Sequence, residues 1–336
     1  MLNDKSILIT GGTGSFGKHF IQKVTKIYKP TKLIVYSRDE LKQYEMHQNI
    51  SNSKYSCLRY FLGDVRDQPR LRTALEGVDL VIHAAALKQV PAAEYNPFEA
   101  VKTNIIGAQN LIEAAISCDV KKVIALSTDK AASPINLYGA TKLASDKLFI
   151  AANNFVGSRD IKFSVVRYGN VMGSRGSVIP LFMDQSKKGI LSITDIRMTR
   201  FNITLDDGVN FVIKSIENMK GGEIFVPKIP SYRILDLAEA IAPGAKKKII
   251  GIRPGEKLHE EMITVNDARN TIEFENYFII TPNSKYLSIN FESFLDDSNG
   301  ARGSICIEDF SYNSGTNVKF LNIDELRKLI NKNILS

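Results

Sequence analysis

The sequence has few of the residues that build disulfide bonds or metal centres. It contains three cysteines and four histidines in 336 residues. Cys57, Cys118 and Cys306 have no spacing typical of a metal or redox site. We therefore expect reduced, structural thiols, as in a cytoplasmic protein. His259 stands beside Glu260 without a third ligand at a suitable spacing, so no metal is expected.

Long apolar segments are also missing. No run approaches the roughly 18 apolar residues that a membrane-spanning helix requires, so no membrane association is expected. A strand pattern begins at Ser6, which leaves no room for a secretory signal peptide. Together these features predict a cytoplasmic location.

The charge balance is positive but dispersed. The net charge is +8, and 44% of the residues are hydrophobic, as in an ordinary soluble globular protein. Apart from Lys246, Lys247 and Lys248, which we expect in a loop after Pro243 and Gly244, basic residues are scattered. No basic segment is interleaved with aromatic residues, so no nucleic acid is expected and an anionic small molecule fits better.

Strand and helix patterns alternate along the first half of the chain, which predicts an α/β fold with a doubly wound parallel sheet. Apolar runs predict strands at 6–10, 33–36, 59–62, 80–83, 123–126, 162–167 and 223–227. Helices are expected near 18–25, 39–47, 70–75, 105–115 and 205–216. Ligands bind such sheets at the carboxyl ends of the strands.

A glycine-rich segment follows the first predicted strand and opens a helix. Its glycines permit a tight turn and the close approach of a pyrophosphate to the helix N-terminus. The strand–turn–helix context favours dinucleotide binding over a simple glycine turn. The residues expected to contact the cofactor here are Gly11, Thr13, Gly14, Ser15, Phe16 and Gly17.

The end of the second strand favours NADP over NAD. Ser37 occupies the position where an acid would bind the ribose hydroxyls of NAD, and Arg38 and Lys42 follow it. An arginine can pair with a 2′-phosphate through two hydrogen bonds. The alternative is that Arg38 is a surface residue paired with Asp39.

Later strand ends supply further cofactor candidates. Asp64, before Val65, can hold the adenine edge or cap a helix, and the sequence does not decide between them. Ala84 and the alanines after it are small enough for close approach to the cofactor. We expect His83 to be a packed histidine at the end of its strand rather than a base.

The segment 127–142 carries the residues with acid–base chemistry. Tyr138 and Lys142 stand four apart on a predicted helix, so they share a face, and the ammonium can favour the phenolate needed to oxidise an alcohol. Asp129 and Lys130 form a second acid–base couple that a simple dehydrogenase does not need. Burial would raise the pKa of Asp129 and lower that of Lys130, whereas an ion pair between them would do the opposite. We therefore expect the two not to bridge. A salt bridge with a surface lysine is the alternative.

The chain resembles the extended short-chain dehydrogenases/reductases in its glycine loop, Tyr138 and Lys142. Within them it resembles the C5-inverting UDP-N-acetylglucosamine 4,6-dehydratases over most of residues 5–280. The segments that carry this narrower resemblance are Ser37-Arg38-Asp39-Glu40-Leu41-Lys42, His83-Ala84-Ala85-Ala86-Leu87-Lys88, Ser127-Thr128-Asp129-Lys130 and Arg253-Pro254-Gly255-Glu256-Lys257. Larger membrane-anchored relatives carry an N-terminal membrane region that is not found in this chain. Related 5-epimerising enzymes for capsule sugars can lack the tyrosine, whereas this chain has Tyr138.

The resemblance implies a lyase that uses tightly bound NADP and acts on UDP-N-acetylglucosamine, in the first step of pseudaminic acid synthesis for flagellin glycosylation. It implies that Tyr138, helped by Thr128 and Lys142, removes the C4 hydroxyl proton while hydride passes from C4 to the nicotinamide. It also implies that Lys130 removes the C5 proton and that Asp129 protonates the leaving C6 hydroxyl. It also implies a homo-oligomer. Glu40, Leu41 and Val171 join the implied cofactor contacts.

The implied substrate contacts are Lys88, Thr103, Asn104, Asn170, Arg200, Arg253 and Glu256. We expect residues 1–170 and about 200–230 to form the NADP-binding Rossmann domain, with about 171–199 and 231–336 forming an interleaved lobe for the UDP-sugar. Two alternatives stay open. A UDP-sugar 4-epimerase would not need the Asp129–Lys130 couple, and a non-catalytic NADP-binding sensor would not need Tyr138 and Lys142.

Overall fold

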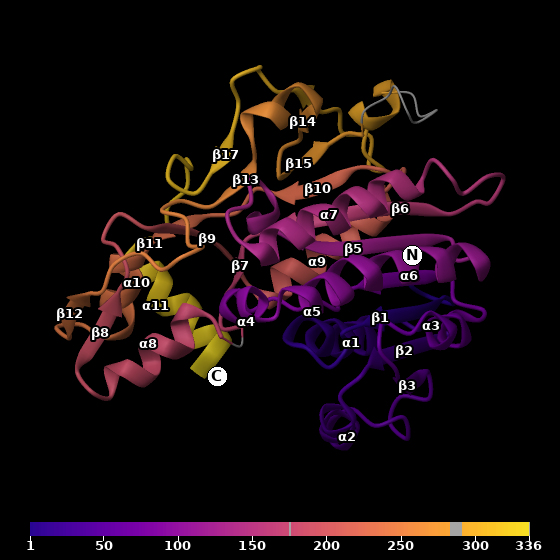
Figure 1. The fold of residues 1–336 in the computed structure, drawn as a ribbon, viewed down its shortest axis with the longest axis horizontal. Helices are drawn as coiled ribbons and strands as arrows, with labels where there is room; N and C mark the ends of the chain where they lie inside the picture. Colours follow the sequence, from indigo (N-terminus) through magenta and orange to yellow (C-terminus); the bar gives the residue numbers. More distant parts are fainter. Residues whose placement is uncertain (175, 283–290, 336) are drawn as a thin grey trace.

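A ten-stranded sheet spans the protein in the computed structural model, which describes residues 1–174, 176–282 and 291–335. Within these residues the strand order is β16-β14-β15-β10-β6-β5-β4-β1-β2-β3. The strands from β3 to β10 are parallel, and β15, β14 and β16 extend the sheet antiparallel beyond β10. Helices cover the sheet, and a smaller lobe lies beside it (Figure 1). This confirms the predicted α/β, doubly wound fold.

The strands of the large sheet are β1 (Ser6–Thr10), β2 (Lys32–Ser37), β3 (Leu58–Leu62), β4 (Leu80–His83), β5 (Lys122–Thr128), β6 (Lys162–Tyr168), β10 (Ile224–Pro227), β14 (Thr271–Glu273), β15 (Tyr277–Ile280) and β16 (Ser304–Ile305). The remaining strands are β7 (Asn170–Val171), β8 (Ile190–Ile193), β9 (Thr199–Ile203), β11 (Ser231–Arg233), β12 (Lys246–Ile249), β13 (Glu261–Ile263) and β17 (Tyr312–Asn313).

The α-helices are α1 (Ser15–Ile27), α2 (Glu40–Asn49), α3 (Gln68–Leu75), α4 (Val90–Tyr95), α5 (Pro97–Val101), α6 (Gly107–Ser117), α7 (Leu137–Ala152), α8 (Val178–Ser186), α9 (Leu205–Asn218), α10 (Ile234–Ile241) and α11 (Ile323–Ile330). Short 3₁₀ and π turns are η1 (Lys102–Ile106), η2 (Asp129–Ala131), η3 (Val265–Asn270), η4 (Phe291–Leu295) and η5 (Asn331–Leu335).

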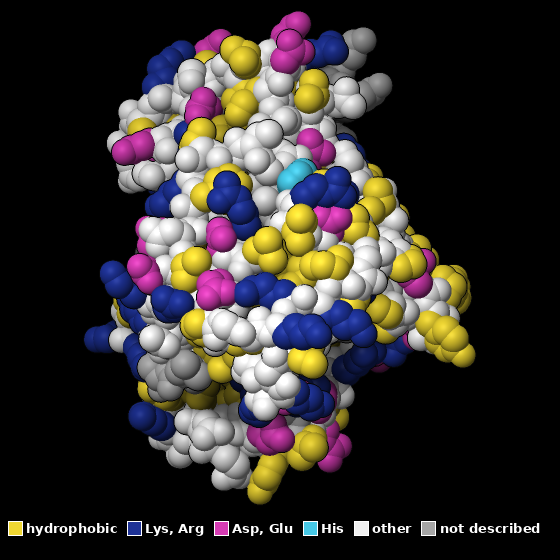
Figure 2. Space-filling model, turned by 90° about the vertical axis from the view of Figure 1, so that its left-hand side faces the viewer, with side chains coloured by type: hydrophobic (Ala, Val, Ile, Leu, Met, Phe, Trp, Pro, Cys, Tyr) yellow, Lys and Arg dark blue, Asp and Glu magenta, His cyan; other side chains and the backbone are white. Residues whose placement is uncertain are grey.

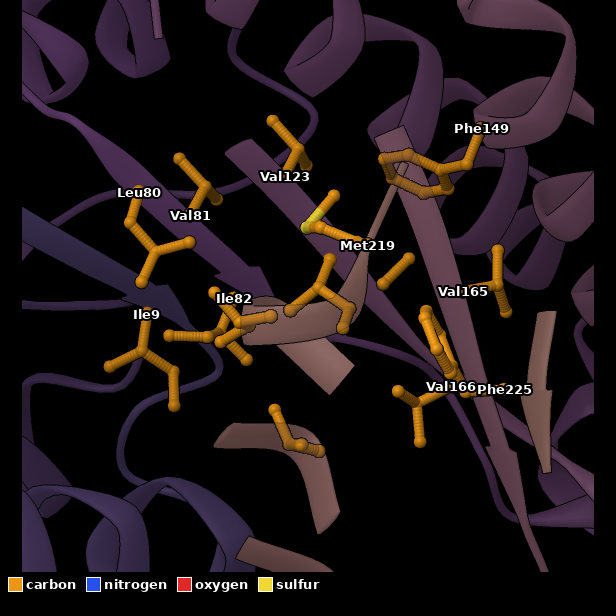
Figure 3. Close-up of a cluster of buried hydrophobic side chains, with 14 of the residues drawn as sticks. Ile9, Leu80, Val81, Ile82, Val123, Phe149, Val165, Val166, Met219 and Phe225 are labelled. Atoms are coloured by element: carbon orange, nitrogen blue, oxygen red, sulfur yellow. The ribbon is translucent and has the colours of Figure 1, made fainter. Parts of the chain in front are cut away.

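The main core lies between the parallel strands and the helices that cover them. Ile9, Val81, Val123 and Val165 come from neighbouring strands and are all fully buried (Figure 3). Phe149 reaches this core from α7, the helix that also carries Tyr138. Strands covered on both faces need continuous apolar runs, which explains why the sequence patterns for these strands were strong.

A second core belongs to the smaller lobe. It is built from segments far apart in the chain, with Phe182 from α8, Leu191 from β8, Leu237 from α10 and Leu326 from α11. The smaller lobe therefore interleaves with the large sheet along the chain, as Figure 1 shows. The sheet pairing differs from the predicted lobe boundaries, because β14, β15 and β16 join the large sheet. The predicted lobe also includes residues 175, 283–290 and 336, which lie outside the described residues.

Two local predictions need correction. The basic run Lys246–Lys248, expected in a loop, begins strand β12, which pairs in parallel with β8. Its charged side chains suit such a short two-stranded sheet, because lysines protect an exposed strand edge from pairing with other chains. The helix expected over 105–115 begins with the π turn η1, and regular α-helix begins only at Gly107.

The cysteines and the basic side chains are arranged as the composition predicts. Cys57, Cys118 and Cys306 are free. On the face shown in Figure 2, lysine and arginine side chains are spread out, with acidic and apolar side chains between them. Within the described ranges, no helix is both long and apolar enough to cross a lipid bilayer.

Removing the aromatic ring of Phe149 should destabilise the protein strongly. The ring is fully buried and lies 5.5 Å from His83 and 6.4 Å from Phe163, measured between ring centroids. We expect Phe149→Ala to lower the free energy of unfolding by about 3–5 kcal/mol, because it leaves a cavity. Phe155→Ala is the control, since that ring is 52% exposed. Equal melting temperatures for the two variants would contradict this view of the core.

Candidate active site

A cavity of about 1170 Å³ lies at the carboxyl ends of the parallel strands, where it meets the smaller lobe. We call this cavity the cleft. Its walls come from the segments that follow β1, β2, β3, β4, β5 and β6 and, on the side of the smaller lobe, from Met198, Arg200 and Ile234. The parallel arrangement brings strand ends together at one edge, so residues distant in the sequence share the cleft.

The glycine-rich segment forms a tight turn at one end of the cleft. Gly11 has φ +65°, and a Cβ atom there would lie 2.9 Å from the backbone of Ala85. A Cβ atom on Gly17 would lie 2.4 Å from the backbone oxygen of Gly12. Gly14 precedes α1 and provides no side-chain cap, so the first N–H groups of the helix can donate hydrogen bonds to an anionic ligand. Thr13, Ser15 and Phe16 also line the cleft.

The end of β2 leaves one arginine free of its neighbouring acid. Asp39 caps α2 by accepting a 3.0 Å hydrogen bond from the Lys42 backbone, and it also pairs with the Lys42 ammonium. Arg38 is 60% exposed and faces Asp64 at 3.8 Å instead. The alternative pairing of Arg38 with Asp39 is therefore not found. Ser37 hydrogen bonds to Thr13 through the two hydroxyl groups, which ties the strand end to the glycine turn.

Asp64 does not cap a helix, because the N-cap residue of α3 is Asp67. Its carboxylate accepts hydrogen bonds from the backbone N–H, Nε and Nη2 of Arg66, the last at 2.7 Å. It does line the cleft, as does Val65. Glu40 and Leu41 begin α2, are both exposed, and do not line the cleft.

The loop after β4 holds both site and support residues. Ala84 and Lys88 line the cleft, and burial lowers the pKa of Lys88. His83 is packed as expected, with Nδ1 2.8 Å from the Thr10 hydroxyl, and burial lowers its pKa to about 3. Asn104, an implied substrate contact, does not line the cleft. Its amide hydrogen bonds to both backbone groups of Leu87, at 2.8 and 3.0 Å, so it fixes this loop.

Helix α7 presents Tyr138 and Lys142 to the cleft. Asn136 caps the helix by accepting a 2.8 Å hydrogen bond from the Gly139 backbone. Burial raises the pKa of Tyr138 to about 12, although the Lys130 ammonium and a hydrogen bond with Thr128 act to lower it. Burial lowers the pKa of Lys142. The structure thus differs from our expectation, because the cation with the strongest effect on the phenol is Lys130 rather than Lys142.

Asp129 and Lys130 lie in the turn η2, directly after β5. The Asp129 side chain is 1% exposed, and its Oδ1 accepts hydrogen bonds from the Thr128 hydroxyl at 2.9 Å and from Lys130 Nζ at 3.1 Å. Burial raises the pKa of Asp129. The expectation that the two residues do not bridge is therefore wrong, since η2 turns both side chains toward the same point.

Glu260 is a member of this group that the sequence did not reveal. Its Oε1 lies 3.1 Å from Lys130 Nζ and 3.6 Å from Arg200 Nε, and its side chain is 3% exposed. Burial acts to lower the pKa of Lys130, but the nearby carboxylates of Asp129 and Glu260 outweigh it, and the pKa is raised. This corrects our expectation that the pKa of Lys130 is lowered. The only sequence signal was an acid next to His259.

The smaller lobe contributes the remaining implied contacts. Arg200 is 9% exposed, and its Nη1 donates to the backbone oxygens of Thr199 and Leu258 at 2.7 and 3.2 Å. Arg253 has a half-exposed side chain, 3.9 Å from Glu256. Asn170 and Val171 form β7 and also line the cleft.

Unpartnered polar atoms gather in the cleft. Among the described residues, ten buried side-chain oxygen or nitrogen atoms have no hydrogen-bond partner, and six belong to residues that line the cleft. Because buried polar groups are normally paired, this excess indicates a polar ligand. These six atoms are Thr103 Oγ1, Asp129 Oδ2, Asn170 Oδ1, Ser177 Oγ, Glu256 Oε2 and Glu260 Oε2. In the described part of the chain, no three His, Cys, Asp or Glu side chains are grouped to hold a metal ion.

The sequence is related to curated proteins along nearly its full length. It is 57% identical to an inverting UDP-N-acetylglucosamine 4,6-dehydratase of Campylobacter jejuni, covering 98% of each chain. It is 41% identical to a UDP-glucose 4-epimerase of Rickettsia akari, covering 98% of this chain and 96% of that one.

Solved structures give the same fold. Pen from Bacillus thuringiensis has a TM-score of 0.87 at 38% identity and covers 100% of this chain and 99% of its own. The dTDP-glucose 4,6-dehydratase DesIV from Streptomyces venezuelae has a TM-score of 0.66 at 22% identity, covering 75% and 86%, which supports the fold alone. The model of the polysaccharide biosynthesis protein family matches residues 7–282. The chain therefore belongs to this family.

Proposed function

We propose that this protein is a C5-inverting UDP-N-acetylglucosamine 4,6-dehydratase, a hydro-lyase that uses tightly bound NADP. The observation that carries the proposal is the Asp129–Lys130 couple, held beside Tyr138 in a cleft large enough for a cofactor and a sugar nucleotide. The identity to the Campylobacter jejuni relative supports the same reaction.

The cleft suits a dinucleotide. The turn at Gly11 leaves no room for a Cβ atom, and the N-terminus of α1 has no side-chain cap, so both favour a bound pyrophosphate. Arg38, exposed at the end of β2, supports binding of a 2′-phosphate. A nicotinamide bound there would accept hydride from C4 of the sugar and return it at C6, while C5 takes up one proton in place of the one removed, so that the C4 ketone of the product forms.

Tyr138 acts on the C4 hydroxyl. At neutral pH the phenol holds its proton in the protein alone, because its pKa is about 12. It must therefore lose that proton before it can accept the one from the sugar. The nearby Lys130 ammonium and the hydrogen bond with Thr128 favour the phenolate. Lys142, buried on the same face of α7, would position the cofactor.

Asp129 and Lys130 act on C5 and C6. The bridged pair already holds the proton that the reaction needs. Transfer of one proton from Lys130 Nζ to Asp129 Oδ1, 3.1 Å apart, converts an ammonium and a carboxylate into an amine and a carboxylic acid. The amine then takes the C5 proton made acidic by the C4 ketone, and the acid protonates the C6 hydroxyl. The C6–O bond breaks, the C5=C6 bond forms, and water leaves with the original ion pair restored.

The diphosphate and sugar would occupy the side of the cleft formed with the smaller lobe. Arg200 and Arg253 are the cations there, and Glu256 has a free carboxylate oxygen for a ribose or uracil donor. Lys88, Thr103 and Asn170 face the position of the hexose in this arrangement. Asn104 would act through the loop it supports. The homo-oligomer and the role in pseudaminic acid synthesis for flagellin glycosylation remain predictions from the resemblance.

The epimerase alternative is supported by the 41% identity to the Rickettsia akari relative. The test is incubation with UDP-N-acetylglucosamine without added cofactor. A product that has lost one water supports the dehydratase, and an isomer of unchanged mass supports the epimerase. Cofactor binding without turnover would support the non-catalytic sensor. Proton NMR of the product in deuterated water would report the configuration and exchange at C5.

Lys130→Ala should nearly abolish dehydration without preventing nucleotide binding. Loss of one acid–base group lowers the rate by about 10²–10⁴-fold. The measurement is product formation by mass spectrometry beside binding of UDP-N-acetylglucosamine by calorimetry. The control is Lys147→Ala, which removes an exposed lysine from the same helix as Tyr138. Turnover equal to that of the unchanged protein would rule out Lys130 as the base.

Arg38→Ala should weaken NADP binding more than NAD binding. A charge-assisted hydrogen bond contributes about 1.5–3 kcal/mol, so the NADP dissociation constant should rise roughly 10–100-fold. Titration of the cofactor-free protein with each dinucleotide measures this. Arg72→Ala, an exposed arginine on α3, is the control. An equal loss for both cofactors would count against a 2′-phosphate site at Arg38.

A further inference from the structure

Glu260 is placed where the proposed chemistry would be sensitive to its charge. It stands directly before β13, 130 residues from Lys130 in the sequence, yet its Oε1 contacts Lys130 Nζ at 3.1 Å. Its backbone N–H donates a 2.9 Å hydrogen bond to the Ser314 hydroxyl, which fixes the position of the residue. Its second oxygen, Oε2, is buried without a partner among the described residues and belongs to the cleft.

Lys130 is therefore shared between two carboxylates. The distances from its Nζ to Asp129 Oδ1 and to Glu260 Oε1 are equal, at 3.1 Å each. Both carboxylate side chains are nearly fully buried, at 1% and 3% exposure. Two buried carboxylates hold an ammonium more firmly than one carboxylate does, because little water is present to screen their charges.

Other charged and titratable groups also face Glu260, and they come from several elements. Arg200 of β9 lies 3.6 Å from the Glu260 carboxylate. Burial acts to raise the pKa of Glu260, but the charges of Lys130, Arg200 and, from the preceding loop, Lys257 outweigh it and lower the pKa. Burial raises the pKa of Tyr232 of β11, and the charges of Lys130 and Glu260 also act on it. The charged and titratable groups that interact electrostatically with Glu260 include Asp129, Lys130, Arg200, Tyr232 and Lys257, and Tyr138 is linked to it through Lys130.

We propose that Glu260 is a positioning residue that holds the Lys130 ammonium beside Asp129 between turnovers and sets the pH range in which the couple works. The proposal rests on the dehydratase function proposed above. In that scheme the Asp129–Lys130 couple works when it holds one of the two protons that it can bind. Turnover should therefore fall at both low and high pH.

The sign of the effect of Glu260 follows from its charge. A carboxylate near Lys130 and Asp129 favours the protonated form of both, so it raises both pKa values. Replacing it with an uncharged amide of the same shape removes this effect. Both the acid and the alkaline limb of the pH profile should then move to lower pH.

The experiment compares the pH dependence of UDP-N-acetylglucosamine dehydration in the unchanged protein and in Glu260→Gln. We expect both limbs to move down by roughly 1–3 pH units, the usual effect of one charge at this distance. At alkaline pH the variant should lose activity far more than at acidic pH. A uniform loss across the profile would mean a merely structural role and would overturn the proposal.

Two further variants complete the test. Glu261→Gln changes the neighbouring acid, whose carboxylate accepts a 3.2 Å hydrogen bond from Ser133, and should leave the profile in place. Glu260→Asp keeps the charge but moves it away from Lys130. The limbs of its pH profile should therefore lie between those of the unchanged protein and those of Glu260→Gln. If Glu260→Gln does not fold, as judged by melting temperature and NADP binding, an unmoved profile in Glu260→Asp overturns the proposal. If the unchanged protein does not dehydrate the substrate, the proposed function itself fails, which is a separate result.

Discussion

Four charged side chains share one buried place where the two lobes meet: Asp129, Lys130, Glu260 and Arg200. Burying any one of them alone would cost several kcal/mol, so each depends on the others to stay in place. The group links the end of β5 to β9 and to the segment before β13. The large sheet and the smaller lobe are thus joined through the same charges that would act on a substrate.

This arrangement changes how the acid–base couple should be understood. An isolated lysine buried in a cleft would lose its proton readily, whereas Lys130 is held as an ammonium by its neighbours. An amine base can still arise if the proton moves to Asp129, whose own burial favours the acid form. A bridge between base and acid is therefore compatible with the proposed dehydration, because the pair keeps the proton count that elimination requires.

In the rest of the cleft, some residues are free to contact a ligand, and others hold the neighbouring loops in place. The glycine turn, the exposed Arg38 and the unpartnered oxygens of Thr103 and Asn170 face space that a ligand can occupy. Asn104, although implied as a substrate contact, makes its side-chain hydrogen bonds with the backbone of Leu87 and the hydroxyl of Thr141. Motif resemblance groups such residues together, and only their hydrogen bonds distinguish a residue that contacts the ligand from one that holds the loop.

The parallel sheet, the glycine turn and the shared face of Tyr138 and Lys142 could be predicted from the amino-acid order, because they depend on neighbours a few residues apart and on apolar runs that local patterns record. The folded chain was needed to show that Glu260 contacts Lys130, that Arg38 faces Asp64 rather than Asp39, and that β14–β16 extend the large sheet. These contacts join residues whose separation along the chain carries no periodic signal. They exist because the sheet and the smaller lobe bring strand ends and loops to a single cleft.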